Sequence, residues 1–130
     1  MRLMEYHFKQ HYTLDEARAL LPQVRHWLGQ LDGLREQMQE DEQSLHALLA
    51  GGGDAGGKVV NRWVRAMADF RGVISEFEAR EIQLKDIRRG LLDFPAIIGE
   101  REAFLCWEKD EDDIEHWHDL DAGYAGRERL

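Results

Sequence analysis

The residues best suited to chemistry gather near the C-terminus, where His116 and His118 stand two positions apart and Asp119 and Asp121 follow. Side chains two apart on a β-strand point to the same face, so a strand here would present both imidazoles together. Imidazole nitrogens and carboxylates are ligands that zinc and related divalent transition metals take from proteins. The segment therefore predicts a metal site built from these four residues. The alternative is that the two histidines are surface residues on either side of a packed Trp117.

Cys106 is the single cysteine, so no internal disulfide can form and a reducing, cytoplasmic location is expected. A strand hairpin that pairs Cys106 with His116 would bring the thiol to the face of both imidazoles. A register one residue shorter would send it to the opposite face, and both registers stay open. The apolar neighbours Phe104, Leu105 and Trp107 also allow an inert, buried thiol.

The same region could serve an enzyme, with His118 as general base, Asp119 or Asp121 orienting it, and Arg127 binding an anion. No nucleophile motif accompanies these residues. The glycine-rich segment 51–57 lacks the lysine and the preceding strand that a phosphate-binding loop needs. The sequence therefore favours a non-enzymatic function but leaves an enzyme open.

Charge and hydropathy narrow the class of partner. The 130 residues carry 26 acids against 17 lysines and arginines, a formal net charge of −9. Such a surface repels phosphate backbones and anionic lipids, so we expect neither nucleic acid nor membrane as partner. No run reaches the roughly 18 apolar residues of a membrane-spanning helix, and the first seven residues lack the apolar core of a secretion signal.

Two helices must come before this region. Thr13 and Glu16 form a capping box, and apolar residues then recur at helical spacing as far as Leu49. Pro22 inside this series predicts a local kink or a later start. The glycines of 51–57 end the first helix.

A second apolar series follows from Val60 to Leu84, with Gly90 as the expected stop. The connection is short, so the helices should form an antiparallel hairpin over about residues 13–90.

The period changes after Gly90. Leu91–Pro95 predicts a short extended piece, and Glu102–Trp107 and Ile114–His118 predict two strands joined by the charged turn 109–113. Asp121–Arg127 is a glycine-hinged tail. The expected fold is a single, mainly α domain over residues 1–130: a coiled-coil-like helical hairpin with a small C-terminal antiparallel sheet in residues 91–130.

The length of the hairpin predicts assembly. Helices over residues 14–49 and 59–89 would measure about 54 and 46 Å, whereas a globule of this size is roughly 36 Å across. Something must cover Trp27, Val59 and Trp63 beyond the reach of the C-terminal sheet. We therefore expect a homodimer through the hairpin, with an unidentified protein partner as the alternative.

Several motifs together resemble a prokaryotic family catalogued as domain of unknown function 2203, from about Tyr12 to Leu130. The resemblance rests on these segments of the chain: Tyr12–Pro22, Leu84–Asp86, Gly90–Pro95, Leu105–Trp107, Trp117-His118 and Gly123–Arg127.

The resemblance implies a small bacterial protein with a helical hairpin and no established activity. The family pattern includes a histidine at 118 but not at 116, which counts against a two-imidazole site. A site common to the family would use residues from Asp93 onward. The chain departs from the family at Asp110 and Asp112 in the charged turn, and at its end, which lacks a proline. The site that the resemblance implies would use Asp93, His118, Asp119, Asp121 and Arg127. A pocket is expected around Asp93, Cys106, Tyr124 and Arg127.

Three functions remain, in order of preference. The first is an interaction or scaffold module that assembles through the hairpin. The second is a metal-binding module centred on His118, with zinc as the expected ion. The third is an enzyme with a pocket between the base of the hairpin and the C-terminal sheet.

Overall fold

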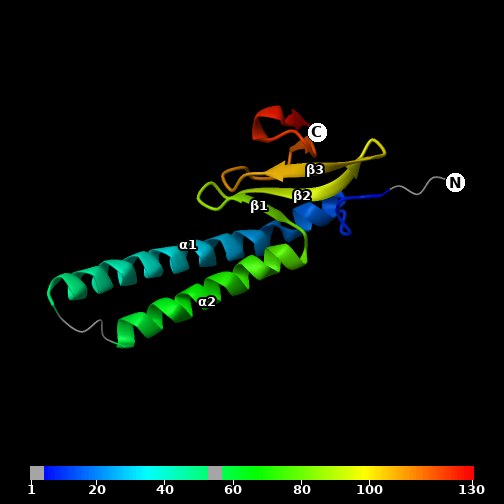
Figure 1. Ribbon diagram of the computed structural model, residues 1–130. Helices are drawn as coiled ribbons and strands as arrows, with labels where there is room; N and C mark the ends of the chain where they lie inside the picture. The colour runs from blue at the N-terminus through cyan, green and yellow to red at the C-terminus, as the bar shows by residue number, and fades with distance from the viewer. Residues whose placement is uncertain (1–4, 53–56) are drawn as a thin grey trace. The chain divides into compact units, whose positions relative to one another are not determined.

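The computed structural model describes residues 5–52 and 57–130, so most of the predicted glycine-rich tip lies outside the described residues. Two long helices come first in the chain and the strands follow (Figure 1). The chain divides into two compact units, one of residues 26–76 and the other of residues up to 25 together with 77–130. Both helices contribute to both units. The predicted fold class, a helical hairpin followed by a small antiparallel sheet, is confirmed.

The first helix, α1, runs over Leu14–Ala50 and begins at the predicted capping box. The Thr13 amide donates to Glu16 Oε1 at 2.9 Å, and the Glu16 amide donates to the Thr13 hydroxyl oxygen at 3.1 Å. The pair satisfies two N–H groups near the start of the helix. Pro22 lies inside the helix without ending it, so the alternative of a later start is wrong because the capping box fixes the first turn.

The second helix, α2, runs over Gly57–Ala79, and its predicted end at Gly90 is wrong. It ends in a Schellman motif, in which the Ile82 amide donates to the Phe77 carbonyl at 3.0 Å and Glu81 takes a left-handed conformation with φ of 57°. Ile82 and Phe77 are both buried, so the hydrophobic contact that accompanies this motif stabilises the turn. The apolar series continues past the helix because it passes into a strand.

Five antiparallel strands form one sheet in the order β1-β2-β3-β4-β5, which is also their order in the chain (Figure 1). The strands β2, β3 and β4 overlap the predicted extended segments, whereas β1 and β5 were not predicted. The strands span Gln83–Asp86 (β1), Leu91–Ile98 (β2), Arg101–Trp107 (β3), His116–Asp119 (β4) and Glu128–Arg129 (β5), and a short 3₁₀ helix, η1, spans Tyr124–Gly126.

Gly90 lies in the turn between β1 and β2, where its φ is +62°. A Cβ at this position would lie 2.7 Å from Lys109 Cβ, so a side chain is excluded by space as well as by conformation. The glycine therefore serves a tight strand turn, and the sequence signal that resembled a helix stop arose from this requirement.

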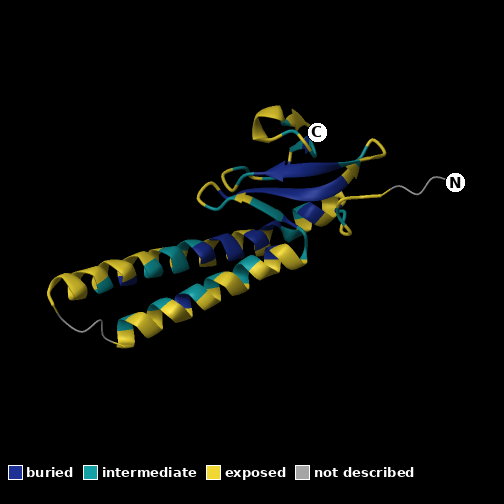
Figure 2. Ribbon diagram, viewed as in Figure 1, coloured by how far each residue is buried: buried dark blue, intermediate teal, exposed yellow. Residues whose placement is uncertain are grey.

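The central strands β2 and β3 are buried on both faces along most of their length (Figure 2). In this unit Tyr12 packs edge-on against Phe94, with ring centroids 5.5 Å apart, and the Arg25 guanidinium lies 5.1 Å from the Trp107 ring. Alternation along the strands places Asp93 and Cys106 on the face opposite these aromatic residues. The apolar face consists of Leu92, Phe94, Ala96, Ala103, Leu105 and Trp107.

In the unit of residues 26–76, α1 and α2 are joined by an ion pair at 2.8 Å between Oδ1 of the buried Asp41 and Nε of the exposed Arg62. Trp63 also donates to Glu42 Oε1 at 3.2 Å, so the next residue on each helix makes a second link between them. Within the described residues, neither helix is both long and apolar enough to cross a membrane.

Candidate metal centre

Three strands bring one thiol, one carboxylate and one imidazole to a single face of the sheet. In the strand register Asp93 lies opposite Cys106, Cys106 lies opposite His116, and Phe104 lies opposite His118. Of the two registers that the sequence left open, the structure has the one that pairs Cys106 with His116. Side chains of residues that pair across two strands lie on the same face of the sheet, so Asp93, Cys106 and His116 share a face. His118 is two residues from His116 on the same strand and therefore lies on that face as well.

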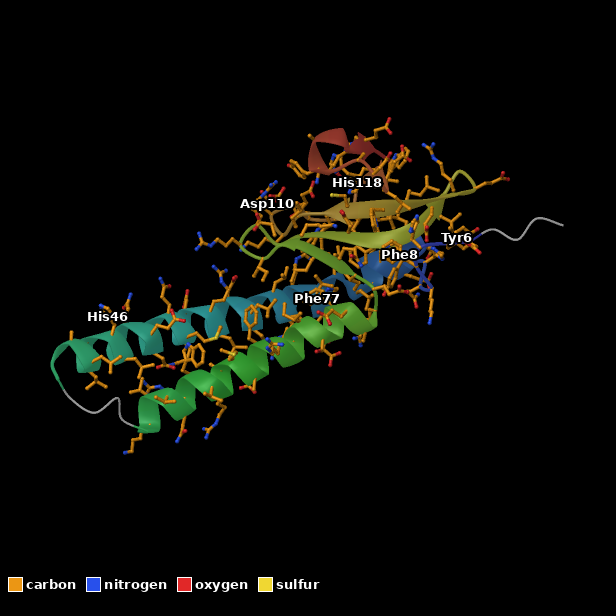
Figure 3. The ribbon with its side chains drawn as sticks, in the orientation of Figure 1. Tyr6, Phe8, His46, Phe77, Asp110 and His118 are labelled. Atoms are coloured by element: carbon orange, nitrogen blue, oxygen red, sulfur yellow. The ribbon has the colours of Figure 1, made fainter. Side chains whose placement is uncertain are left out.

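Ligand atoms of Asp93, Cys106 and His118 all lie within 4.8 Å of one another, and all three residues are buried. Figure 3 labels His118 among the strands of the sheet. Asp93, Cys106 and His118 are 3%, 1% and 2% exposed, respectively. A tetrahedral zinc ion, with bonds of about 2.0–2.3 Å, holds its ligand atoms roughly 3.3–3.7 Å apart. The widest separation would therefore need to close by about 1 Å for all three atoms to bind one ion. In the described part of the chain this is the one group of three or more such residues.

The orientation of the His118 ring leaves one nitrogen available. Nδ1 lies 2.7 Å from the Asp119 carbonyl oxygen, which can only accept, so the ring proton of neutral His118 sits on Nδ1. The unprotonated Nε2 then faces Asp93 Oδ1 at 3.0 Å. Oδ1 has no hydrogen-bond partner among the described residues, although it is buried. Two lone pairs at this distance repel each other unless a proton or a metal ion lies between them.

The Cys106 thiol is neutral in this environment. Burial, with a smaller contribution from the Asp93 charge, raises its pKa to about 12. Arg127 acts in the opposite direction, and its Nη1 lies 4.0 Å from Sγ. A thiol of this kind is not a nucleophile at neutral pH, but a metal ion that binds it displaces its proton.

Arg127 is held beside the thiol by Glu111. Its two terminal nitrogens donate to the two Glu111 oxygens at 3.0 and 2.9 Å, a bidentate arrangement that fixes the guanidinium plane. Glu111 Oε2 also lies 3.3 Å from His116 Nδ1. The predicted ligand His116 therefore shares the sheet face of Cys106, but its Nδ1 lies next to Glu111.

A cavity of about 250 Å³ opens beside the three residues. Tyr124 of η1 forms part of its wall, and the Tyr124 ring lies between the guanidiniums of Arg89 and Arg127, 4.4 and 4.5 Å from them. The full lining is Lys85, Leu91, Asp93, Phe104, Cys106, His118, Leu120, Ala122, Gly123 and Tyr124.

The other predicted ligands lie elsewhere. The Asp119 carboxylate pairs with Arg101 at 3.1 Å, and Asp119 contributes only its backbone oxygen to the centre. Asp121 is exposed and lines a second hollow together with His7 and Phe8. The structure thus brings together His118, Asp93, Cys106, Tyr124 and Arg127 of the residues singled out from the sequence, and separates Asp119 and Asp121 from them.

Two residues near the centre were missed. Lys85 was assigned to the second helix, whereas it lies in the strand β1. Glu111 was predicted only as one of several acids in the charged turn 109–113. Its position just before the strand that carries His116 was the signal that could have identified it as a residue of the centre.

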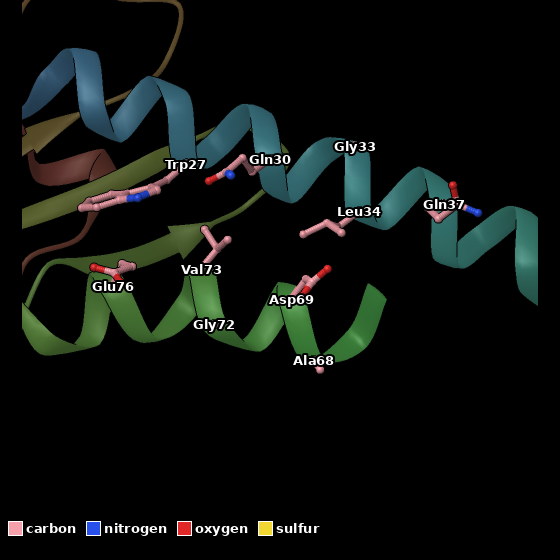
Figure 4. A pocket seen from close by; sticks show the side chains of 10 residues that line it. All are labelled: Trp27, Gln30, Gly33, Leu34, Gln37, Ala68, Asp69, Gly72, Val73 and Glu76. Carbon is pink, nitrogen blue, oxygen red and sulfur yellow. The ribbon is translucent and has the colours of Figure 1, made fainter. Parts of the chain in front are cut away.

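In the unit of residues 26–76, a groove of about 780 Å³ lies between the two helices (Figure 4). Gly33 and Gly72 leave the space, and Trp27 and Val73 line it. None of the metal-ligand cluster described above comes from this groove, so the candidate centre is the one in the sheet.

Comparison with known proteins gives one match. A family described as "Uncharacterized conserved protein (DUF2203)" matches residues 10–130, which confirms the resemblance seen in the sequence. No curated protein and no solved structure matches the chain. The chain belongs to the DUF2203 family.

Proposed function

We propose that this member of the family is a metal-binding protein, with zinc held by Asp93, Cys106 and His118. One observation supports the proposal above the others: a buried imidazole nitrogen faces a buried carboxylate oxygen at 3.0 Å, and a thiol lies beside both. Nitrogen, oxygen and sulfur in one set are the donors that zinc takes from proteins.

The contacts around the ring agree with a metal ligand. Histidines that bind metals usually donate their other N–H to a carbonyl or carboxylate, which fixes the ring and its tautomer. His118 makes this bond to Asp119 O at 2.7 Å. A proton on Nε2 would also relieve the repulsion from Asp93, and Cys106 would then hydrogen-bond to Asp93 as a neutral thiol instead of binding a metal. Metal binding and a protonated His118 therefore differ in whether the Cys106 sulfur is a metal ligand.

Three protein ligands leave one position of a tetrahedral ion open. Asp93, Cys106 and His118 all line the 250 Å³ cavity, so the open position would face it. Structural zinc sites are closed by four protein ligands, whereas sites that bind a further molecule keep a position free. The proposal also agrees with a cytoplasmic location, where a single thiol remains reduced.

The experiment is metal analysis of protein purified without chelator, followed by replacement with Co²⁺. We expect one equivalent of metal in the wild type, and a thiolate-to-cobalt charge-transfer band in the near ultraviolet. The variants Cys106→Ser and His118→Ala should each lose most of the metal. His116→Asn is the matched control, because it changes an imidazole on the same strand that faces Glu111, and it should retain the metal.

Because substitutions at buried sites can unfold the protein, the cobalt band of the wild type is the deciding measurement. A cobalt complex without the thiolate band would exclude Cys106 as a ligand. A wild type that binds neither zinc nor cobalt would end the proposal.

A second function is supported by the hairpin. Four aliphatic side chains near the ends of the helices are exposed: Leu48, Leu49, Val60 and Val64, the last two one turn apart on α2. Residues 26–50 of α1 carry five acids and one arginine, whereas residues 57–76 of α2 carry four lysines and arginines and two acids. An isologous dimer would place the acidic helix of one copy beside the basic helix of the other. We therefore propose homodimerisation through the hairpin as a scaffold function.

Light scattering tests this proposal. We expect the wild type at twice the 15.2 kDa of one chain, and the double variant Leu49→Glu, Val64→Glu at the mass of one chain. Ile97→Glu, which changes an exposed aliphatic residue in β2, should remain a dimer. A wild type of single-chain mass at micromolar concentration would contradict dimerisation.

A further inference from the structure

The cavity beside the metal centre has a defined chemistry, which follows from its walls. Four apolar side chains, Leu91, Phe104, Leu120 and Ala122, line it, and Asp93 and Cys106 would be occupied as metal ligands. Among the described residues that line the cavity, the one cationic side chain is Lys85. A molecule that fills the cavity therefore meets the metal ion, hydrocarbon and one ammonium group.

A β-bulge places Lys85 at this cavity. The pairing of β1 with β2 shifts between Leu84 and Asp86, so that Lys85 is the extra residue. Bulges re-aim a side chain and are frequent beside functional sites. The Lys85 ammonium lies 5.9 Å from the centre of the Phe104 ring, which is itself part of the cavity wall.

The charges of the metal ion, its ligands and Lys85 indicate which net charge a bound molecule should carry. A divalent ion bound by the Asp93 carboxylate, the Cys106 thiolate and neutral His118 gives a centre without net charge. Lys85 then leaves one positive charge at the cavity, which matches a ligand with one negative charge. A phosphate or a dicarboxylate would bring more negative charge than these groups neutralise.

The volume of the cavity limits the length of the ligand. At about 30 Å³ per water molecule, 250 Å³ corresponds to roughly eight waters. A carboxylate of about three to five carbon atoms, with roughly five to seven non-hydrogen atoms, is smaller than this volume and fits within it, and its chain would contact the apolar walls.

We propose, on the basis of the metal site proposed above, that the open coordination position takes a small aliphatic monocarboxylate of about three to five carbon atoms. One carboxylate oxygen binds the metal ion, the other accepts a hydrogen bond from Lys85, and the chain lies against Leu91, Phe104 and Leu120. The ligand exchanges for bound water, and no covalent bond of the ligand changes.

The test uses Co²⁺-loaded full-length protein titrated with butyrate and followed by its visible absorption. Butyrate should shift the spectrum saturably, whereas butyramide, the neutral molecule of the same shape, should not. Lys85→Met should weaken butyrate binding by at least about tenfold, the loss typical of a charged hydrogen bond. Lys58→Met, which removes a lysine from the other unit, should leave the affinity unchanged.

The outcomes separate the two proposals. If Co²⁺ binds but butyrate leaves the spectrum unchanged, or binds equally well to Lys85→Met, the ligand assignment is overturned and the metal site stands. Tighter binding of inorganic phosphate than of butyrate would also overturn it. If Co²⁺ does not bind, both proposals fall together.

Discussion

At the scale of single residues, the proton on the Cys106 thiol opposes metal binding. Its pKa of about 12 means that it carries a proton in the metal-free protein at neutral pH. The metal ligand is the thiolate, so binding must release this proton to solvent.

Zinc affinity should therefore rise with pH. If one thiol proton is released, the apparent dissociation constant falls about tenfold for each pH unit between pH 7 and 8. Competition with a chromophoric chelator at several pH values measures this slope, and a dye in weak buffer measures the released proton. An affinity that does not change with pH would show that sulfur is not a ligand.

Arg127 tunes the same group, because its guanidinium favours the thiolate and Glu111 holds it in place. Arg127→Gln should strengthen zinc binding several-fold, because exchange of the thiol proton for Zn²⁺ adds a positive charge that the guanidinium repels. Arg129→Gln is the control, since Arg129 makes an exposed ion pair with Glu115, and exposed pairs contribute little. Equal zinc affinities of the two variants would contradict a role for Arg127.

At the scale of elements, the sequence predicted where the strands lie better than how they pair. Alternation and the position of His118 indicated a strand, but the face of Cys106 depended on a register that local sequence does not determine. The contribution of Asp93 came from the family resemblance, because a lone carboxylate in an apolar strand has no metal signature of its own. These residues come from three consecutive strands, so the pairing of those strands decides whether they meet.

The end of α2 could not be predicted from apolar spacing. A helix period and a strand that enters a core both place large side chains at intervals that overlap over a few residues. Here a non-glycine residue, Glu81, takes the left-handed position. Its side chain explains why glutamate fits there: Oε1 accepts the backbone amides of Lys9 and Gln10 at 2.8 and 2.7 Å.

The N-terminal segment is fixed by a second carboxylate, Glu102 of β3. It accepts the amides of His7 and Phe8 at 2.8 and 3.0 Å and lies 2.7 Å from His11 Nε2. Burial alone would raise the pKa of Glu102, but the bonds from His11, His7 and Phe8 outweigh it and hold the pKa below its ordinary value of 4.5. Its stabilisation is therefore present above pH 4.5 and is lost as the pH falls through the lower, folded-state pKa.

We expect the segment to detach first when the protein is acidified. Hydrogen exchange should show faster exchange at the amides of residues 7 and 8 at low pH than the intrinsic pH dependence explains. Glu102→Gln should have the same effect at pH 7, because it removes the charge that these donors face. Glu100→Gln, an exposed neighbour in the turn after β2, is the control, and equal protection in the two variants would contradict the role of Glu102.

At the scale of the whole molecule, the two units differ in what should stabilise them. The sheet unit is assembled from two stretches of chain, with residues 26–76 inserted between them. The proposed centre links β2, β3 and β4, so a metal ion would cross-link the strands of this unit alone. The hairpin unit relies on its own contacts, such as the ion pair between the buried Asp41 and the exposed Arg62.

Zinc should therefore stabilise the molecule unevenly. A ligand at a thousand times its dissociation constant adds about 4 kcal/mol to the free energy of unfolding, which corresponds to roughly 10 °C or more in the melting temperature of a chain of this size. Calorimetry with zinc and with chelator measures the shift. Native-state hydrogen exchange should show the added protection at β2, β3 and β4, while amides of residues 26–76 that exchange by local opening keep their rates. Equal added protection in both units would mean that they unfold as one, and an unchanged melting temperature would mean that the centre holds no metal.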